Sequence, residues 1–74
     1  MKKVKLEIEV KVPDEANWLA FDKDGTPCWF VNKPSVNGYV FDVVEPDGGE
    51  AEIEYYTWGR GEIKGWKKTL IRVE

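Results

Sequence analysis

The sequence predicts an all-β protein, a small antiparallel meander of five or six strands that forms a barrel-like structure or a sandwich of SH3-like or OB-like size. Apolar and polar residues alternate with a period of two in several short segments, as in strands with one buried face. Turn residues separate these segments at regular spacing, and no segment shows the period of an amphipathic helix of typical length. The predicted turns lie at residues 13–16, 24–25, 33–38 and 46–49.

Residues 3–12 alternate almost without exception and predict one long strand. Its apolar face would hold Val4, Leu6, Ile8, Val10 and Val12, and its polar face Lys3, Lys5, Glu7, Glu9 and Lys11. Pro13 lacks a backbone N–H and therefore ends the strand. Residues 13–16 then form a loop or a single helical turn.

The next segment predicts a β-hairpin with arms near residues 17–22 and 26–32, joined at Asp24-Gly25. Asp and Gly tolerate the positive φ angles of a type I′ turn, which this dipeptide favours. Both arms carry apolar residues on both faces: Trp18 and Ala20 against Leu19 and Phe21, then Cys28 and Phe30 against Trp29 and Val31. We therefore expect the hairpin to be covered on both sides or to lie at an interface.

The rest of the chain predicts three further elements. Residues 33–38 form a turn and residues 39–45 a strand, followed by the turn at 46–49 and a strand over 50–58 that glycines 59 and 61 end. In the last element, residues 66–73, a strand is favoured because Thr69, Ile71 and Val73 align with a period of two. Trp66 and Leu70 are also four residues apart, so a short helix over this part is the alternative.

Length and composition predict one domain over residues 1–74, near the lower limit for an independent core. Hydrophobic residues make up 42% of the chain, as in ordinary globular proteins, which argues against disorder. The chain also has four Trp, three Tyr and three Phe. Because this is more aromatic surface than a very small core holds, we expect a homo-oligomer or a ligand-binding surface.

The net charge and the cysteine content indicate which kinds of binding partner and which cellular compartment to expect. Eleven basic and 14 acidic residues give a net charge of −3, which disfavours binding to duplex DNA. With one cysteine the chain forms no internal disulfide and is typical of cytosolic proteins. No apolar run approaches the ~20 residues that span a membrane, and the N-terminus lacks the apolar stretch of a signal peptide.

Groups for enzyme chemistry are scarce. The chain has no histidine, and Cys28 lies in an apolar run without a histidine partner, which favours a buried structural thiol over a nucleophile. Residues 22–25 resemble part of a calcium loop, but its bidentate glutamate position would fall at Val31. No ligand set for zinc is evident. We therefore expect a protein without enzymatic activity, metal or cofactor.

Two stretches of opposite charge are candidate binding regions. The acidic stretch has no basic residue between its carboxylates, Asp42, Glu45, Asp47, Glu50, Glu52 and Glu54. Such a run favours a solvated strand face with an acidic turn, and the alternatives are a patch for a basic partner or mimicry of nucleic-acid charge.

The C-terminal stretch combines aromatic and basic residues, namely Trp58, Arg60, Lys64, Trp66, Lys67, Lys68 and Arg72. Aromatic stacking combined with cations is a general way to hold a nucleobase and its phosphate. In this hypothesis Trp58 and Trp66 stack on the ligand, and Arg60, Lys67 and Lys68 hold phosphate or carboxylate. In the alternative the two tryptophans pack in the core and the lysines keep a sheet edge soluble.

Three segments together resemble a family of small phage and prophage proteins. These are residues 17–26 (Asn-Trp-Leu-Ala-Phe-Asp-Lys-Asp-Gly-Thr), residues 32–34 (Asn-Lys-Pro) and residues 66–70 (Trp-Lys-Lys-Thr-Leu). The family has a Trp-x-Ala-x-Asp-x-x-Gly hairpin, a Lys-Pro after it and a terminal Trp-x-x-Ser/Thr-Leu. The resemblance implies a phage or bacterial cytoplasmic setting, where small proteins often bind and block host machinery. It transfers no activity and no functional residue, and the N-terminal strand lies outside it.

These features lead to three functional hypotheses. The first is a non-enzymatic phage-type binding protein, a host-defence inhibitor that sequesters a nucleotide-like ligand or masks a host protein, and that forms a homo-oligomer. The second is a single-strand nucleic-acid-binding small barrel, which requires its basic and aromatic residues on one open face. The third is a structural subunit of a virion or complex, without a small-molecule pocket.

Overall fold

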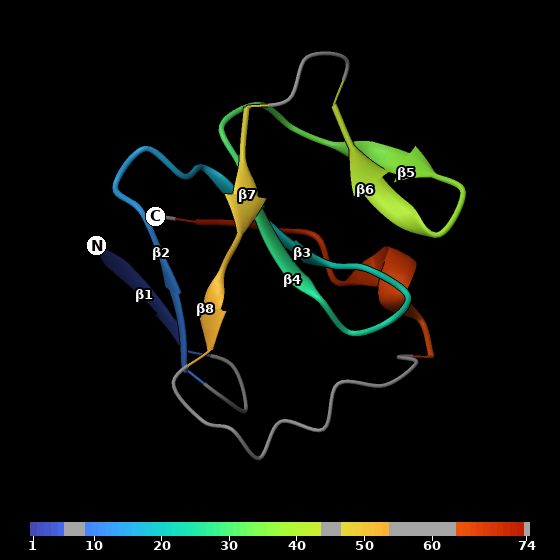
Figure 1. Ribbon diagram of the computed structural model, residues 1–74, viewed down its shortest axis with the longest axis horizontal. Helices are drawn as coiled ribbons and strands as arrows, with labels where there is room; N and C mark the ends of the chain where they lie inside the picture. The colour runs from blue at the N-terminus through green and yellow to red at the C-terminus, as the bar shows by residue number, and fades with distance from the viewer. Residues whose placement is uncertain (6–8, 44–46, 54–63, 74) are drawn as a thin grey trace.

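The computed structural model describes residues 1–5, 9–43, 47–53 and 64–73 (Figure 1). Within these ranges the chain forms nine short strands and one turn of 3-10 helix. They are β1 (Lys2–Lys5), β2 (Glu9–Val12), β3 (Trp18–Phe21), β4 (Pro27–Phe30), β5 (Ser35–Asn37), β6 (Val40–Asp42), β7 (Gly49–Glu50), β8 (Glu52–Ile53), η1 (Trp66–Lys68) and β9 (Ile71–Arg72). The predicted all-β class is confirmed, although the strands are shorter and more numerous than the five or six expected.

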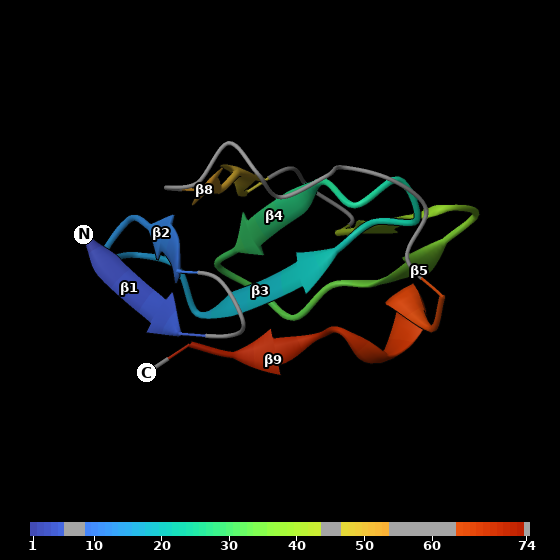
Figure 2. The same ribbon diagram turned by 90° about the horizontal axis from the view of Figure 1, so that it is seen from below.

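The strands are arranged in three antiparallel sheets. Sheet order is β1-β2-β8 in the first, β7-β4-β3-β9 in the second and β5-β6 in the third. The β3–β4 hairpin is the middle of the four-stranded sheet, with the β1–β2 pair toward one end of the molecule and the β5–β6 ribbon toward the other (Figure 2). The predicted hairpin is therefore the central element of the fold.

The hairpin itself is confirmed, but its predicted type I′ turn is wrong. Trp18 pairs with Phe30 at one end of the register and Phe21 with Pro27 at the other. A type I′ turn needs positive φ at two successive residues, and in the loop Gly25 alone has it, with φ 88°. The Asp22 N–H donates to the Thr26 carbonyl over 3.0 Å, and this bond closes a three-residue loop. Gly25 supplies the left-handed residue that ends such a loop.

Apolar clusters cover both faces of this hairpin, as its sequence predicts. The first cluster comprises Val10, Val12, Ala16, Leu19, Phe21, Ala51 and Val73, with Val4, Trp29 and Ile71 packed against it. The second cluster comprises Ala20, Phe30, Phe41 and Trp66, with Trp18, Cys28, Val43 and Leu70 packed against it. Neighbouring residues of β3 thus enter opposite clusters, which is why neither arm shows a polar face.

The prediction of one long strand over residues 3–12 is wrong, because β1 and β2 fold back on each other. Lys3 pairs with Lys11 and Val4 with Val10, so the numbers of paired residues add up to 14. Even-numbered residues therefore face even-numbered residues, and the apolar face survives the reversal. Strict alternation fits one long strand and this hairpin equally well. Residues 6–8, which connect the two strands, lie outside the described residues.

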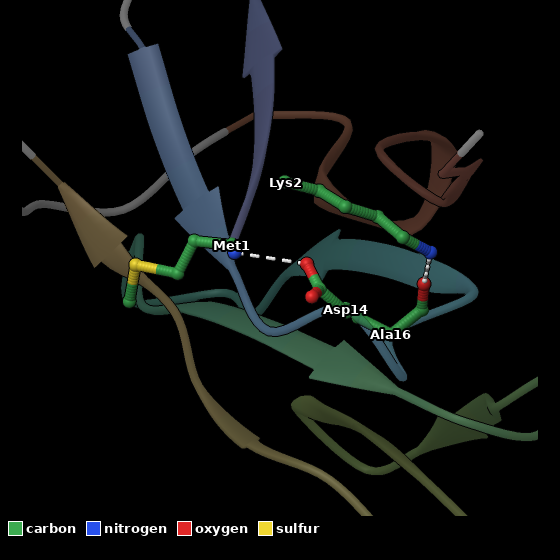
Figure 3. A network of polar contacts seen from close by, with 4 residues as sticks. All are labelled: Met1, Lys2, Asp14 and Ala16. Atoms are coloured by element: carbon green, nitrogen blue, oxygen red, sulfur yellow. Dashed lines mark hydrogen bonds and ion pairs between the residues drawn. The ribbon is translucent and has the colours of Figure 1, made fainter.

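Polar contacts join the start of β1 to the turn that follows β2 (Figure 3). The terminal ammonium of Met1 lies 2.9 Å from an Asp14 carboxylate oxygen, and Lys2 Nζ donates to the Ala16 carbonyl over 2.8 Å. The hydrogen bond to this ammonium and its charge hold the pKa of Asp14 below its ordinary value. The Ala16 N–H donates to the Pro13 carbonyl, and residues 13–16 form the predicted turn.

Residues 33–38, predicted as a turn, contain strand β5, which pairs with β6 as a two-stranded ribbon. The predicted strand over 39–45 begins one residue late, at Val40, and residues 44–46 lie outside the described residues. Gly38 and Tyr39 connect the two strands, and Gly38 has a φ of 66°. Positive φ at the first of two loop residues is a hairpin geometry that favours glycine.

The predicted strand over residues 50–58 is divided between two sheets. β7 pairs with β4 and β8 pairs with β2, and the buried Ala51 lies between them. Residues 54–63 lie outside the described residues. Before β7, a Cβ added to Gly48 would lie 1.8 Å from the Trp29 carbonyl oxygen. Glycine is therefore required here for the chain to approach β4.

The C-terminal segment contains parts of both predicted alternatives. Trp66–Lys68 form the 3-10 turn η1, and Ile71–Arg72 form strand β9 beside β3. The 3-10 turn follows Gly65, which has a φ of 73°. Among the described residues, no helix is long and apolar enough to cross a membrane.

Candidate anion-binding site

The structure separates the five residues predicted to bind a ligand. Trp58 and Arg60 lie outside the described residues. Trp66 is 7% exposed, and its ring meets Phe41 edge to face with the centroids 5.6 Å apart. Lys67 and Lys68 are exposed on η1, with Lys67 Nζ 5.8 Å from the centroid of the Trp66 ring. Trp66 therefore packs in the second cluster, where little of its ring surface is open to a ligand.

Another tryptophan, Trp18 on β3, lies beside two cationic side chains. Lys33 Nζ is 5.4 Å and Arg72 Cζ 5.5 Å from the centroid of the Trp18 ring. Both distances are in the range of cation–π interactions. Trp18 is half-buried, whereas Lys33 and Arg72 are exposed. We call these three residues the Trp18 site.

Strand pairing explains how these residues meet. Arg72 on β9 lies directly opposite Trp18 on β3, and paired residues project from the same face of a sheet. Lys33 follows β4, whose last residue, Phe30, lies opposite Trp18 on its other side. Trp18 on the middle strand β3 therefore lies between β9, which carries Arg72, and β4, which leads into the segment with Lys33.

A threonine anchors the segment that carries Arg72. The Phe21 N–H donates to Thr69 Oγ1 over 2.9 Å. The Thr69 hydroxyl in turn donates to the Trp66 carbonyl over 2.6 Å. Directly after Arg72, the Val73 N–H donates to the Asn17 carbonyl over 2.8 Å. These bonds hold residues 69–73 along β3 and keep Arg72 next to Trp18.

The C-terminal segment that carries Arg72 is basic. Residues 64–73 contain no acidic residue, and their basic side chains are all exposed: Lys64, Lys67, Lys68 and Arg72. Among the described residues, neither Lys33 nor Arg72 forms an ion pair with a carboxylate. Glu50 lies on β7, at the opposite edge of the same sheet from β9. The two charged stretches recognised in the sequence thus reach opposite edges of the central sheet.

A small hollow beside β4 and β6 offers less chemistry. Its volume is about 150 Å³, and it is lined by Cys28, Phe30, Phe41, Asp42, Val43, Asp47, Gly48 and Gly49. Burial, followed by the charge of Asp22, raises the pKa of the Cys28 thiol to about 12, so the thiol is neutral at physiological pH. A neutral thiol is a poor nucleophile.

The carboxylates around this hollow have structural hydrogen bonds. Burial opposes ionisation of Asp47, but hydrogen bonds from Asn32 and Val31 outweigh it and lower the pKa of Asp47. Asp22 is 9% exposed and accepts the Phe41 N–H at 2.9 Å, and the Cys28 thiol lies 3.5 Å from its other oxygen. Within the described ranges, no group of three or more candidate ligands could hold a metal ion.

Residues that carry the resemblance to phage proteins lie around the second cluster. Ala20 and Trp66 are members of the cluster, and Trp18 packs against it. Asp22 and Thr69 form the hydrogen bonds that hold β6 and the C-terminal segment to the central hairpin. Their positions give this sequence pattern a structural explanation in packing and hydrogen bonding.

No protein-family model, curated protein or solved structure matches the chain. The sequence does not single out Trp18 and Lys33 as site residues, because Trp18 lies on an apolar arm of the predicted hairpin. The available signal was that Lys33 follows the hairpin arm whose end lies opposite Trp18.

Proposed function

We propose that this chain is a non-enzymatic, phage-type binding protein that sequesters a nucleotide-like anion at the Trp18 site. One observation carries the proposal: two exposed cations lie within 5.5 Å of the centroid of a single half-buried indole. Together they offer an apolar aromatic surface next to positive charge, the combination that suits a ligand with a planar group and a phosphate. In an infected cell, removal of such a ligand would inhibit a host defence that depends on it.

Arginine and lysine would have different roles toward the anion. Arg72 offers a planar fork of N–H donors that matches two phosphate oxygens, whereas Lys33 contributes a compact charge. Lys67 and Lys68 lie on the same C-terminal segment and raise the local positive potential. The ring of Trp18 would contact the planar or apolar part of the ligand.

Calorimetric titration of the protein with ATP, AMP and inorganic phosphate tests the proposal. We expect ATP to bind most tightly and Arg72→Gln or Lys33→Gln to weaken it about tenfold each, since a charged hydrogen bond contributes about 1.5–3 kcal/mol. Lys3→Gln is a matched control, because Lys3 lies in another sheet and pairs with Glu9 at 3.4 Å. Absence of ATP binding, or equal losses in all three variants, would overturn the proposal.

The predicted residues Trp58, Arg60, Lys67 and Lys68 extend this proposal. The double variant Arg60→Ala/Lys67→Ala is expected to weaken ATP binding further if the ligand contacts this part of the chain. Unchanged binding in the double variant, together with a loss in Arg72→Gln, would restrict the site to Trp18 and its two cations.

Binding of single-stranded nucleic acid is a second candidate, and the run of four exposed basic residues from Lys64 to Arg72 favours it. An oligothymidylate would then bind more tightly than ATP, with an affinity that falls steeply as salt rises. A protein that binds neither ATP nor the oligothymidylate would instead fit the structural subunit of a virion or complex.

A further inference from the structure

The β5–β6 ribbon concentrates exposed apolar side chains. Three of the four exposed large hydrophobic residues in the described ranges lie on it: Val36 at 40%, Tyr39 at 70% and Val40 at 42% exposed. The ribbon lies at the end of the molecule opposite the β1–β2 pair (Figure 1). Within the described part of the chain, β5 pairs with β6 and with no other strand. As far as the described residues show, one edge of this ribbon is therefore open.

Hydrogen bonding on β6 shows which backbone groups face that edge. The Phe41 N–H donates to the Asp22 carboxylate, on the side of β6 away from β5. In an antiparallel pair, two opposite residues either exchange their hydrogen bonds or both point them outward. Phe41 lies opposite Val36, so Val36 directs its own N–H and C=O outward from β5. A backbone donor and a backbone acceptor are thus available from the same residue.

The open edge lacks the charged side chains that usually oppose strand pairing. β5 consists of Ser35, Val36 and Asn37, all exposed and all uncharged. The outer strand of the first sheet, β1, contains Lys2 and Lys3, and the outer strand β9 contains Arg72. Charged residues on an edge strand oppose the addition of another strand. Among these outer strands, β5 is the one without a charged residue.

We propose that β5 pairs with β5 of a second copy of this chain, antiparallel and about a twofold axis at Val36. In that register the two Val36 residues lie opposite each other and exchange two N–H···O=C hydrogen bonds. Ser35 then lies opposite Asn37 of the second copy, so no like charges face each other. A second copy fits because the edge is complementary to itself, as a twofold interface requires.

The flanking residues set the size of this interface. Pro34 precedes β5 and has no N–H, and the turn at Gly38 ends the strand, so pairing extends over three residues. Such a short interface belongs to the small, transient class. The dimer should therefore be weak, and its population should rise with protein concentration.

Sedimentation velocity over a series of protein concentrations tests the proposal. The wild-type chain should shift from monomer to dimer, and Val36→Lys should weaken dimerisation about tenfold or more, because it places like charges opposite each other. Val40→Lys is the matched control, since Val40 is equally exposed but lies on β6, whose Phe41 N–H is bonded to Asp22 and not to the proposed second copy. Circular dichroism checks that both variants keep the strand content of the wild type.

Amide hydrogen exchange provides a second readout that depends on the backbone alone. The Val36 N–H should exchange rapidly in dilute protein and slowly in concentrated protein, while the Phe41 N–H stays protected in both. A wild-type chain that is monomeric at every concentration would overturn the proposal. So would a dimer that Val36→Lys leaves intact, whatever the outcome of the ATP titration.

Discussion

The two apolar clusters on either face of the central hairpin are built differently. The first consists of aliphatic side chains with Phe21, and Val10, Val12 and Leu19 are fully buried in it. The second consists largely of aromatic rings, and hydrogen bonds that Asp22 and Thr69 accept from backbone N–H groups position the segments that contribute them. Strand residues supply most of the first cluster, whereas Asp22 and Thr69 hold β6 and the C-terminal segment to the hairpin around the second. The Trp18 site and the β5–β6 ribbon both border the second.

The largest effect is expected in the first cluster. Leu19→Ala should lower the free energy of unfolding by about 2–5 kcal/mol, because it opens a cavity where the side chain has no solvent contact. Urea denaturation measures the change. Val36→Ala, at an exposed position, is the control and should change stability by about 0.5 kcal/mol or less. Equal effects of the two variants would contradict the assignment of the first cluster as the stable core.

A smaller and more local effect is expected at Asp22. Asp22→Ala removes the acceptor of the buried Phe41 N–H and should cost about 1–3 kcal/mol. Amide exchange should increase most in the β5–β6 ribbon, while Val10 and Leu19 stay protected. Asp22→Asn keeps a carbonyl oxygen at the same position and should restore most of the loss. Uniform loss of protection in both clusters would show that they unfold as one unit.

Thr69 provides the corresponding test on the other side of the second cluster. Thr69→Val keeps the shape of the side chain but removes the acceptor of the Phe21 N–H, at a cost of about 1–2 kcal/mol. Because Thr69 holds the segment that carries Arg72, ATP affinity should fall as well. Thr69→Ser retains the hydroxyl and should preserve both properties. Loss of stability with unchanged affinity would separate this anchor from the Trp18 site.

At neutral pH the smallest effect is expected at the thiol on the border of the second cluster. The pKa of Cys28 is raised from its usual 9.0 to about 12, first by burial and then by the charge of Asp22. Its stabilising contribution is thus complete below pH 9 and lost as the pH rises toward 12, because the unfolded chain ionises first. Compared with Cys28→Ala, the wild type should lose stability over this range. Iodoacetamide should also react slowly with the folded protein at pH 8.

The central hairpin shows how far local sequence determines structure. Its arms, its position near Asp24-Gly25 and the assignment of residues to two apolar faces all follow from period-two alternation, and the structure confirms them. The turn type did not follow, because Asp24-Gly25 fits both a two-residue and a three-residue loop. The bond from Asp22 to Thr26, which selects the longer loop, depends on the register of the whole hairpin.

The candidate site was less accessible to sequence reasoning. The basic C-terminal stretch was recognised, and Arg72 belongs to it, but Trp18 and Lys33 lie far away in the sequence. Their approach to Arg72 depends on β9 pairing with β3. Trp66 illustrates the reverse error, since an aromatic residue among lysines has the composition of a binding surface even though its ring packs against Phe41.

The sequence by itself determined the all-β class, the central hairpin and the separation of acidic and basic stretches, because these properties depend on neighbouring residues. The tertiary structure decided that residues 2–12 fold back, that the chain changes sheets at Ala51 and that Trp18 meets Lys33 and Arg72. Each of these outcomes depends on which strands pair. That choice is made by the burial of side chains distant in sequence, a quantity that local patterns do not contain.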